Sequence, residues 1–202
     1  MIAIIDYKIN NLISIYNSLK KINRSVYIAS TKEDILKAQK LILPGVGTYY
    51  EGMKNLRELN LIKPIKEKVL SQNTPILGIC LGMQLMSTYG YEVNKTKGLN
   101  LIEGSVEILS NKKDLPLPHI GWNDISFKGY NKIFNKVSNL SDLYFIHSYH
   151  FKTKNKHESI SQTTYSQEFS SVINRENIYG FQFHPEKSGK IGMQLLENFL
   201  NL

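Results

Sequence analysis

Short, uninterrupted apolar runs alternate with amphipathic stretches through the first half of the chain. Four of these runs predict buried strands, at Ile2–Ile5, Val26–Ala29, residues 41–43 and Ile76–Ile79. Apolar residues at helical spacing predict a helix over residues 12–22. A second helix is expected around residues 61–70, with Pro64 in its first turn. Strands that are apolar throughout and separated by helices are typical of parallel pairing through right-handed crossovers.

The second half has a different rhythm, in which short β-segments are separated by polar turns. These segments are expected at residues 106–109, 123–127, 143–151, 161–165, 170–174 and 179–183. A final helix is predicted over residues 190–200, with Ser188 as its N-cap. Neither a linker nor a repeat divides the sequence. We therefore expect one α/β domain over residues 1–202, with a mixed, mainly parallel central sheet flanked by helices.

Length and composition narrow the class of protein. The 202 residues are 42% hydrophobic and 21% charged, which is ordinary for a globular domain with a core of its own. The sequence starts without a basic targeting region, and no apolar run approaches the ~20 residues that cross a bilayer. Cys80 is the single cysteine, which excludes an internal disulfide and fits a reducing compartment. A cytoplasmic protein without a membrane partner is expected.

The net charge of +8 raises the question of a nucleic-acid partner. The lysines are scattered, however, as at Lys20-Lys21, Lys112-Lys113 and Lys152, Lys154 and Lys156, and no RNA-binding or helix-turn-helix pattern accompanies them. We therefore interpret the excess charge as a solvated basic surface and expect no nucleic acid.

Gly78-Ile79-Cys80-Leu81-Gly82 has the form of a tight turn between a strand and a helix with a nucleophile at its centre. A lone cysteine is most often an inert core residue. Here, the following helix N-terminus would favour the thiolate, and the amide of Leu81 would point to where an oxyanion forms. The pattern predicts that Cys80 is a nucleophile.

A cysteine nucleophile needs a base and a group that orients the base. His184-Pro185-Glu186 follows an apolar run, and residues two apart on an extended segment face the same side. Taken alone, the tripeptide could equally be a polar turn after a strand. Together with the turn around Cys80, it predicts His184 as the base and Glu186 as its orienting carboxylate.

Pro44-Gly45-Val46-Gly47 follows the third predicted strand, at the sheet edge where α/β proteins bind ligands. It lacks the third glycine of a dinucleotide-binding loop and the lysine of a phosphate-binding loop. A flexible loop that supplies a second oxyanion amide fits better. The five histidines have no cysteine partner at metal-ligand spacing, so we expect neither a metal nor another cofactor.

These motifs together resemble the class I glutamine amidotransferases, and more narrowly the glutaminase subunit of imidazole glycerol phosphate synthase. The resemblance runs nearly end to end, through the loop at 44–47, the turn at 78–84, Pro118-His119-Ile120-Gly121-Trp122-Asn123, the segment 145–149 and the segment 182–188. It implies a glutaminase that passes ammonia from L-glutamine to a barrel-type synthase (cyclase) subunit in a heterodimer. Histidine biosynthesis is the implied pathway.

The resemblance also implies roles for individual residues. Cys80, His184 and Glu186 would form the catalytic triad, with Leu81, Val46 and Gly47 around the oxyanion. The residues implied to hold the glutamine substrate are Gln84, Glu92, His147, Ser148 and Tyr149. Those implied to face the partner are Asn11, Trp122, Asn123 and Lys187. A buried structural histidine at 147 and a core tryptophan at 122 remain alternatives.

The first loop departs from the family pattern Asp-Tyr-Gly-x-Gly-Asn, because Lys8 and Asn10 replace the two glycines. This change affects the expected partner surface rather than the chemistry. A paralogous subunit that supplies ammonia to a synthase of surface-glycan sugars is therefore an alternative. A stand-alone cysteine hydrolase and an inactive regulatory subunit are further alternatives, but an intact triad beside Gly121-Trp122-Asn123 argues against both.

Overall fold

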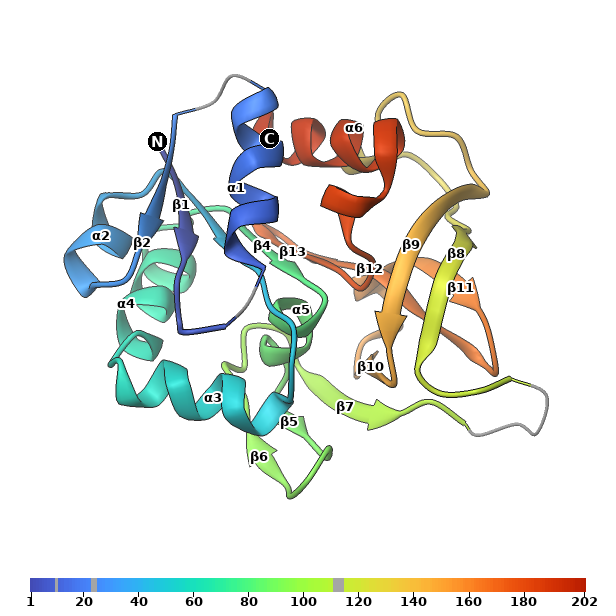
Figure 1. Cartoon of the computed structure of the whole chain (residues 1–202), viewed down its shortest axis with the longest axis horizontal. Helices are drawn as coiled ribbons and strands as arrows, with labels where there is room; N and C mark the ends of the chain where they lie inside the picture. Colours follow the sequence, from blue (N-terminus) through green and yellow to red (C-terminus); the bar gives the residue numbers. More distant parts are fainter. Residues whose placement is uncertain (10, 23–24, 111–114) are drawn as a thin grey trace.

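The computed structural model describes residues 1–9, 11–22, 25–110 and 115–202. Its central feature is a seven-stranded sheet in the order β11-β12-β13-β4-β3-β1-β2 (Figure 1). The strands are β1 (Ile2–Ile5), β2 (Val26–Ala29), β3 (Lys40–Leu43), β4 (Ile76–Ile79), β11 (Ser159–Thr164), β12 (Glu168–Arg175) and β13 (Ile178–Phe181). Strands from β13 to β2 pair in parallel, and β11, β12 and β13 pair antiparallel. This confirms the expected mixed, mainly parallel sheet.

Helices cover both faces of this sheet, which explains why its inner strands are apolar throughout. The helices are α1 (Leu12–Lys21), α2 (Lys32–Lys37), α3 (Tyr49–Glu58), α4 (Ile62–Lys66), α5 (Leu81–Leu85) and α6 (Gly189–Leu200). The side chains of successive residues in β1 pack on opposite faces of the sheet. Ile5 packs with the side chains of α2 to α5, and Ile4 packs with those of α1 and α6.

Helix α4 continues directly into a π-helix at Glu67–Ser71. The predicted helix over residues 61–70 is thus present in two parts. Pro64 is the third residue of α4, as expected of a proline in a helical first turn.

Two smaller sheets lie beside the central one. A four-stranded sheet has the order β10-β7-β5-β6, and β8 pairs with β9 in a two-stranded ribbon. Their strands are β5 (Tyr89–Gly90), β6 (Thr96–Lys97), β7 (Gly104–Ile108), β8 (His119–Ile125), β9 (Ser141–His147) and β10 (Tyr149–Thr153). Short 3₁₀-helices lie at Lys132–Phe134, Lys156–Glu158 and Pro185–Lys187.

Two strand predictions in this region were wrong in detail. The segment 143–151 is not one strand, because the chain leaves the ribbon at Ser148 and joins the four-stranded sheet as β10. Strand β8 begins at His119 rather than at residue 123. Its early apolar residues, Ile120 and Trp122, face outward, so their alternation gave no sign of a buried strand.

The carboxyl ends of four neighbouring parallel strands meet at one edge of the central sheet. Strand β1 leads to Tyr7 and the first loop, β3 to the loop at 44–47, β4 to Cys80, and β13 to the segment with His184. Segments far apart in the sequence are therefore brought together where α/β sheets bind ligands.

The first loop keeps a backbone shape that suits glycine although it lacks glycine there. Lys8 has φ 61° and Asn11 has φ 89°. The left-handed conformation costs roughly 1 kcal/mol for a residue such as lysine. The carboxylate of Asp6 accepts a hydrogen bond from the Lys8 amide at 2.9 Å and supports the turn. Asn10, the other position that departs from the family pattern, lies outside the described residues.

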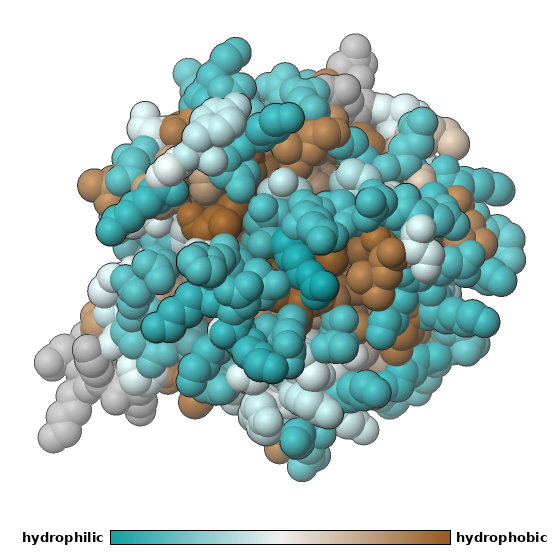
Figure 2. Space-filling model, turned by 180° about the vertical axis from the view of Figure 1, so that it is seen from behind, coloured by the Kyte–Doolittle hydropathy of each residue, from teal (hydrophilic) through white to brown (hydrophobic). Residues whose placement is uncertain are grey.

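The surface seen from behind in Figure 2 is mainly hydrophilic, with a few brown patches near the centre of the view. Among the described residues, none of the helices combines the length and apolar character needed to span a bilayer.

Candidate active site

Cys80 sits in a strained turn between β4 and α5. Its φ of 53° and ψ of −111° lie outside the regions that non-glycine residues favour. A Cβ on Gly78 would lie 2.6 Å from the amide nitrogen of Met83, and one on Gly82 would lie 1.7 Å from the carbonyl oxygen of Leu43. Both flanking glycines are therefore required for the turn to form against β3.

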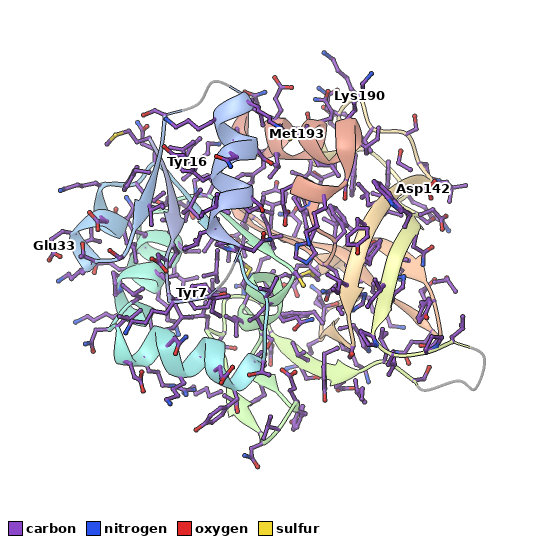
Figure 3. The ribbon with its side chains drawn as sticks, viewed as in Figure 1. Tyr7, Tyr16, Glu33, Asp142, Lys190 and Met193 are labelled. Carbon is purple, nitrogen blue, oxygen red and sulfur yellow. The ribbon has the colours of Figure 1, made fainter. Side chains whose placement is uncertain are left out.

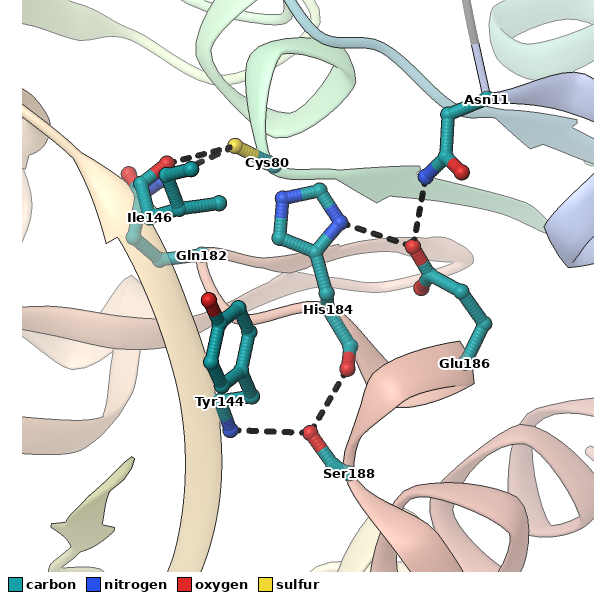
Figure 4. A network of polar contacts seen from close by, with 8 residues as sticks. All are labelled: Asn11, Cys80, Tyr144, Ile146, Gln182, His184, Glu186 and Ser188. Carbon is teal, nitrogen blue, oxygen red and sulfur yellow. Dashed lines mark hydrogen bonds and ion pairs between the residues drawn. The ribbon is translucent and has the colours of Figure 1, made fainter. Parts of the chain in front are cut away.

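His184 and Glu186 lie next to this cysteine, as the sequence predicts. His184 Nδ1 is 2.8 Å from Glu186 Oε1, and Asn11 donates to the same oxygen at 2.7 Å. The His184 ring lies between Cys80 and the Glu186 carboxylate (Figure 4). Its Nε2 is buried with no hydrogen-bond partner among the described residues. The imidazole is thus oriented through one nitrogen and has the other available for a proton.

Electrostatics favour a charged His184 beside a Cys80 thiolate, which is the state that follows proton transfer from the thiol. Burial disfavours the imidazolium, but the contacts with Cys80 and Glu186 outweigh burial and raise the pKa of His184 to about 10. Burial alone would raise the pKa of Glu186, yet its hydrogen bond and charge interaction with His184, helped by Asn11, hold that pKa below the usual value. An acid–base residue paired with a fixed carboxylate suits proton transfer to and from a thiol.

The backbone around His184 is held by Ser188 and Tyr144. Ser188 Oγ donates to the His184 carbonyl at 2.6 Å and accepts from the Tyr144 amide at 2.9 Å. Ser188 does occupy the N-cap position of α6, but its hydroxyl makes no capping hydrogen bond. The predicted N-cap position is therefore confirmed, but the Ser188 hydroxyl joins the His184 segment to β9 instead of capping the helix.

A small pocket of about 260 Å³ opens onto the Cys80 side chain. This volume is slightly below the usual range for small-molecule sites, which begins at about 300 Å³. All the residues that the family resemblance assigns to the oxyanion and to the substrate line it: Val46, Gly47, Leu81, Gln84, Glu92, His147, Ser148 and Tyr149. The structure thus brings eight predicted residues from four segments to one cavity.

The loop at 44–47 is held in a defined position beside this pocket. The Tyr7 hydroxyl donates to the Pro44 carbonyl at 2.6 Å, and a Cβ on Gly45 would lie 2.3 Å from that hydroxyl. The Leu81 amide, expected to face an oxyanion, donates to the Gly45 carbonyl at 3.3 Å. Gly47 has φ 119°, a conformation that L-residues rarely adopt. In this arrangement the Leu81 amide, one of the predicted oxyanion donors, is already hydrogen-bonded to the Gly45 carbonyl.

His147 lies at the pocket wall but is engaged on both ring nitrogens. Its Nδ1 is 2.9 Å from the Tyr149 carbonyl, which accepts only, so this nitrogen carries the proton. Its Nε2 then accepts from His119 Nδ1 at 3.1 Å. Burial lowers the pKa of His147 to about 3 and that of His119 to about 4. Both rings are neutral near pH 7, so neither supplies positive charge to the pocket.

The residues predicted to face a partner differ in exposure. Trp122 is 58% exposed and packs edge-on against Tyr144, and the Lys187 ammonium lies 5.7 Å from the centre of the same Tyr144 ring. Asn123 is half-buried: its amide nitrogen donates to the Thr164 carbonyl at the surface and lies 3.3 Å from His119 Nε2 on the inner side. Asn11 contacts Glu186, as described above. Trp122 is therefore not a core residue, and Asn11 and Asn123 make contacts that reach into the protein.

Three residues of this region did not stand out in the sequence. Tyr7, labelled in Figure 3, is buried and fixes the loop at 44–47; burial first, and then the nearby Cys80, raise its pKa. His119 bonds to His147, and Gln182 contacts the Cys80 sulfur. Gln182 lies two residues before His184 at the end of an apolar strand. Residues i and i+2 share a side of a strand, so that spacing could have indicated it.

Comparisons with known proteins show the family of the chain. The family model described as glutamine amidotransferase class-I matches residues 3–202. The chain is 45% identical over 202 residues to "Imidazole glycerol phosphate synthase subunit HisH 1" of Campylobacter jejuni subsp. jejuni, with 100% of both chains covered. It is also 45% identical to subunit HisH 2 of Methanococcus maripaludis, over 99% of this chain and 98% of that one.

A solved structure described as "Crystal structure of glutamine amidotransferase" has the same fold, with a TM-score of 0.75 over 98% of this chain and 97% of that chain at 15% identity. The full-length sequence matches and the shared fold lead to one conclusion. The chain belongs to the class I glutamine amidotransferase family.

Proposed function

We propose that this protein is a glutaminase in which Cys80, His184 and Glu186 release ammonia from L-glutamine. The observation that carries the proposal is the position of the Cys80 turn and the paired His184 and Glu186 at one pocket, together with the family. We assign residues 1–202 to one amidotransferase domain. The free cysteine and the biosynthetic names of the relatives support a cytoplasmic location.

The proposed reaction begins with transfer of the Cys80 thiol proton to His184 Nε2. The sulfur then attacks the side-chain amide carbon of glutamine, and the carbonyl oxygen becomes an oxyanion. His184 gives the proton to the amide nitrogen, and the carbon–nitrogen bond breaks. Ammonia departs, and the glutamyl group stays on Cys80 as a thioester. Water then attacks the thioester with His184 as base. The carbon–sulfur bond breaks, glutamate departs, and the cysteine is regenerated.

The pocket wall suggests how glutamine is held. Gln84 and Glu92 offer oxygens for the substrate ammonium. Burial raises the pKa of Glu92, and the hydrogen bond from the Tyr49 amide partly opposes this shift. The backbone at residues 147–149 offers amides for the substrate carboxylate. We assign the oxyanion to the amides of Leu81 and the Val46–Gly47 peptide. The Leu81 amide can donate to the oxyanion once its hydrogen bond to the Gly45 carbonyl is broken.

We further propose that the protein is the glutaminase subunit of an imidazole glycerol phosphate synthase, as the names of its relatives suggest. In this function, ammonia passes to a barrel-type cyclase that makes imidazole glycerol phosphate and AICAR in histidine biosynthesis. The two subunits would form a heterodimer. Exposed Trp122, packed against Tyr144, provides an aromatic surface of the kind that anchors interfaces, and Lys187 lies beside it.

One observation keeps a second pathway in view. The same Methanococcus maripaludis strain has two relatives, named HisH 1 and HisH 2, at 40% and 45% identity to this chain. Two copies in one organism leave room for two acceptors. With Lys8 in the first loop, this supports a paralogous glutaminase for a surface-glycan sugar synthase as the alternative.

Complementation separates the two pathways. Expressed with its cognate cyclase in a histidine auxotroph that lacks the glutaminase subunit, the gene should restore growth without histidine. The cognate cyclase is needed because Lys8 places a charged side chain where family members have glycine, and a foreign partner could be rejected. Growth with the wild type and its absence with Cys80→Ala would support the proposal. Failure with the cognate cyclase, alongside ammonia transfer to a sugar synthase, would overturn the histidine assignment.

A further inference from the structure

Gln182 is a fully buried side chain in direct contact with the nucleophile. It follows β13, and its Nε2 donates to Cys80 Sγ at 3.8 Å (Figure 4). Its Oε1 accepts from Gln84 Nε2 at 3.1 Å. Burial of a primary amide is costly unless its polar atoms are paired, and both ends of this amide have partners. The reaction described above leaves Gln182 without a role.

The orientation of the Gln182 amide follows from the hydrogen-bond chemistry around it. The Tyr149 carbonyl accepts only, and Gln84 Nε2 lies 2.8 Å from it, so the nitrogen of Gln84 must face this carbonyl. The same nitrogen also faces Gln182, which therefore presents its oxygen to Gln84. The Gln182 nitrogen is left to face the sulfur. A flipped Gln182 would set two donors against each other at Gln84 and aim an oxygen at the sulfur.

The sulfur has contacts that favour different protonation states. The Ile146 carbonyl lies 3.7 Å from Cys80 Sγ and accepts from the thiol. Once the proton has moved to His184, this carbonyl loses its hydrogen bond and repels the negative sulfur. The Gln182 contact then becomes a charge-assisted hydrogen bond and grows stronger. The amide therefore acts selectively on the thiolate.

We propose that Gln182 is a further catalytic residue of the glutaminase, which donates to the Cys80 sulfur while Gln84 holds its amide in that orientation. This inference rests on the proposed function. In the first step, the sulfur keeps the electron pair of the broken sulfur–hydrogen bond, and the proton goes to His184 Nε2. When the thioester is hydrolysed, the electron pair of the carbon–sulfur bond returns to sulfur, and the Gln182 amide again donates a hydrogen bond to the thiolate. Gln84 links this donor to the pocket that takes the substrate.

Other titratable groups also face the sulfur or its pocket. They are Tyr7 from the loop after β1, His184 backed by Glu186 after β13, His147 from β9, Tyr149 from β10 and Glu92 across the pocket. All of them remain in variants at position 182. A difference between such a variant and the wild type therefore reports the amide itself.

The test is the pH dependence of Cys80 alkylation by iodoacetamide in the purified full chain, without glutamine or partner. Because Cys80 is the only cysteine, alkylation reports on that residue alone. Gln182→Met and Gln182→Leu retain bulk but lack a donor. Each should move the alkylation midpoint upward by about one pH unit, the effect of one charge-assisted hydrogen bond. With the partner bound, glutamine turnover should fall about tenfold in the same variants.

Gln167→Met is the matched control, because the Gln167 amide bonds to His150 instead of to the sulfur. Its alkylation midpoint should equal that of the wild type. Circular dichroism and thermal melting identify folded variants, and either folded variant at position 182 decides the outcome. A midpoint within about 0.3 pH units of the wild type would overturn the role of Gln182. Failure of the glutaminase proposal would look different: a shifted midpoint without any glutamine hydrolysis.

Discussion

Cys80→Ala should abolish glutamine-dependent synthesis by the complex while ammonium-dependent synthesis continues at the wild-type rate. Loss of a catalytic nucleophile costs roughly 10⁴-fold or more, because no other group forms the covalent intermediate. The partner active site is untouched by the change and accepts ammonia from solution. The measurement is product formation by the reconstituted complex with glutamine and, separately, with ammonium.

His184→Ala and Glu186→Gln extend this series. His184→Ala should be about as damaging as the cysteine change, because the thiol then has no base. Glu186→Gln should reduce the rate less, since it leaves the imidazole in place. The loss that remains comes from removal of the carboxylate charge, which helps to raise the pKa of His184. Retention of more than about one hundredth of the glutaminase rate by Cys80→Ser would contradict the covalent mechanism.

The second large effect is dependence on the partner. Alone, the protein should hydrolyse glutamine roughly 10²–10³ times more slowly than in complex with the synthase and the synthase's ligand. The physical reason lies in the loop at 44–47: the Gly45 carbonyl accepts from the Leu81 amide, which is then unavailable to an oxyanion. Loss of one oxyanion donor accounts for a factor of this size. Glutamate release, followed with increasing synthase concentration, measures it.

Trp122→Ala provides a graded version of this experiment. Truncation of an exposed aromatic anchor should raise the synthase concentration needed for half-maximal activation by about tenfold or more. The activated rate at saturating synthase should remain near that of the wild type. Full activity of the isolated wild-type chain would rule out gating by the loop.

The continuous apolar runs of the sequence were sufficient to predict strands in the parallel part of the sheet. The continuous apolar runs at Ile2–Ile5, Val26–Ala29 and Ile76–Ile79 are strands with those same bounds. Their two buried faces leave little ambiguity in the pattern. Helices α2 and α3 were missed, although each starts at a capping threonine: Thr31 accepts from the Asp34 amide, and Thr48 accepts from the Glu51 amide. Capping patterns three residues apart could have revealed both.

The antiparallel half was harder to predict for a physical reason. Strand β8 turns Ile120 and Trp122 outward and buries His119 on the other side. Hydrophobic alternation is informative only when the apolar face is the buried one. Nor could the pattern show that the chain changes sheets at Ser148, because β9 and β10 both continue as extended backbone.

For the site, the motifs predicted which residues would meet but not how they are paired. Cys80 and the His184–Glu186 pair were identifiable because each follows a strand at the same sheet edge, whereas the substrate residues of the pocket were implied only by the family resemblance. The roles of Tyr7 and Gln182 depend on side-chain contacts across 37 and 102 residues of sequence. The spacing of Gln182 and His184 puts both on one side of the segment, but no local pattern shows which distant side chain either Tyr7 or Gln182 contacts. Likewise, the Leu81–Gly45 hydrogen bond depends on how the loop packs on the turn.

Transfer of amide nitrogen from glutamine tests the central claim most directly. The reconstituted complex would receive glutamine labelled with ¹⁵N in its side-chain amide, together with an excess of unlabelled ammonium. Mass spectrometry of the synthase product then reports the source of its new nitrogen. If the protein releases ammonia at Cys80 and passes it directly to its partner, the product should carry mainly ¹⁵N. A product whose label matches that of the ammonium in solution would contradict this account.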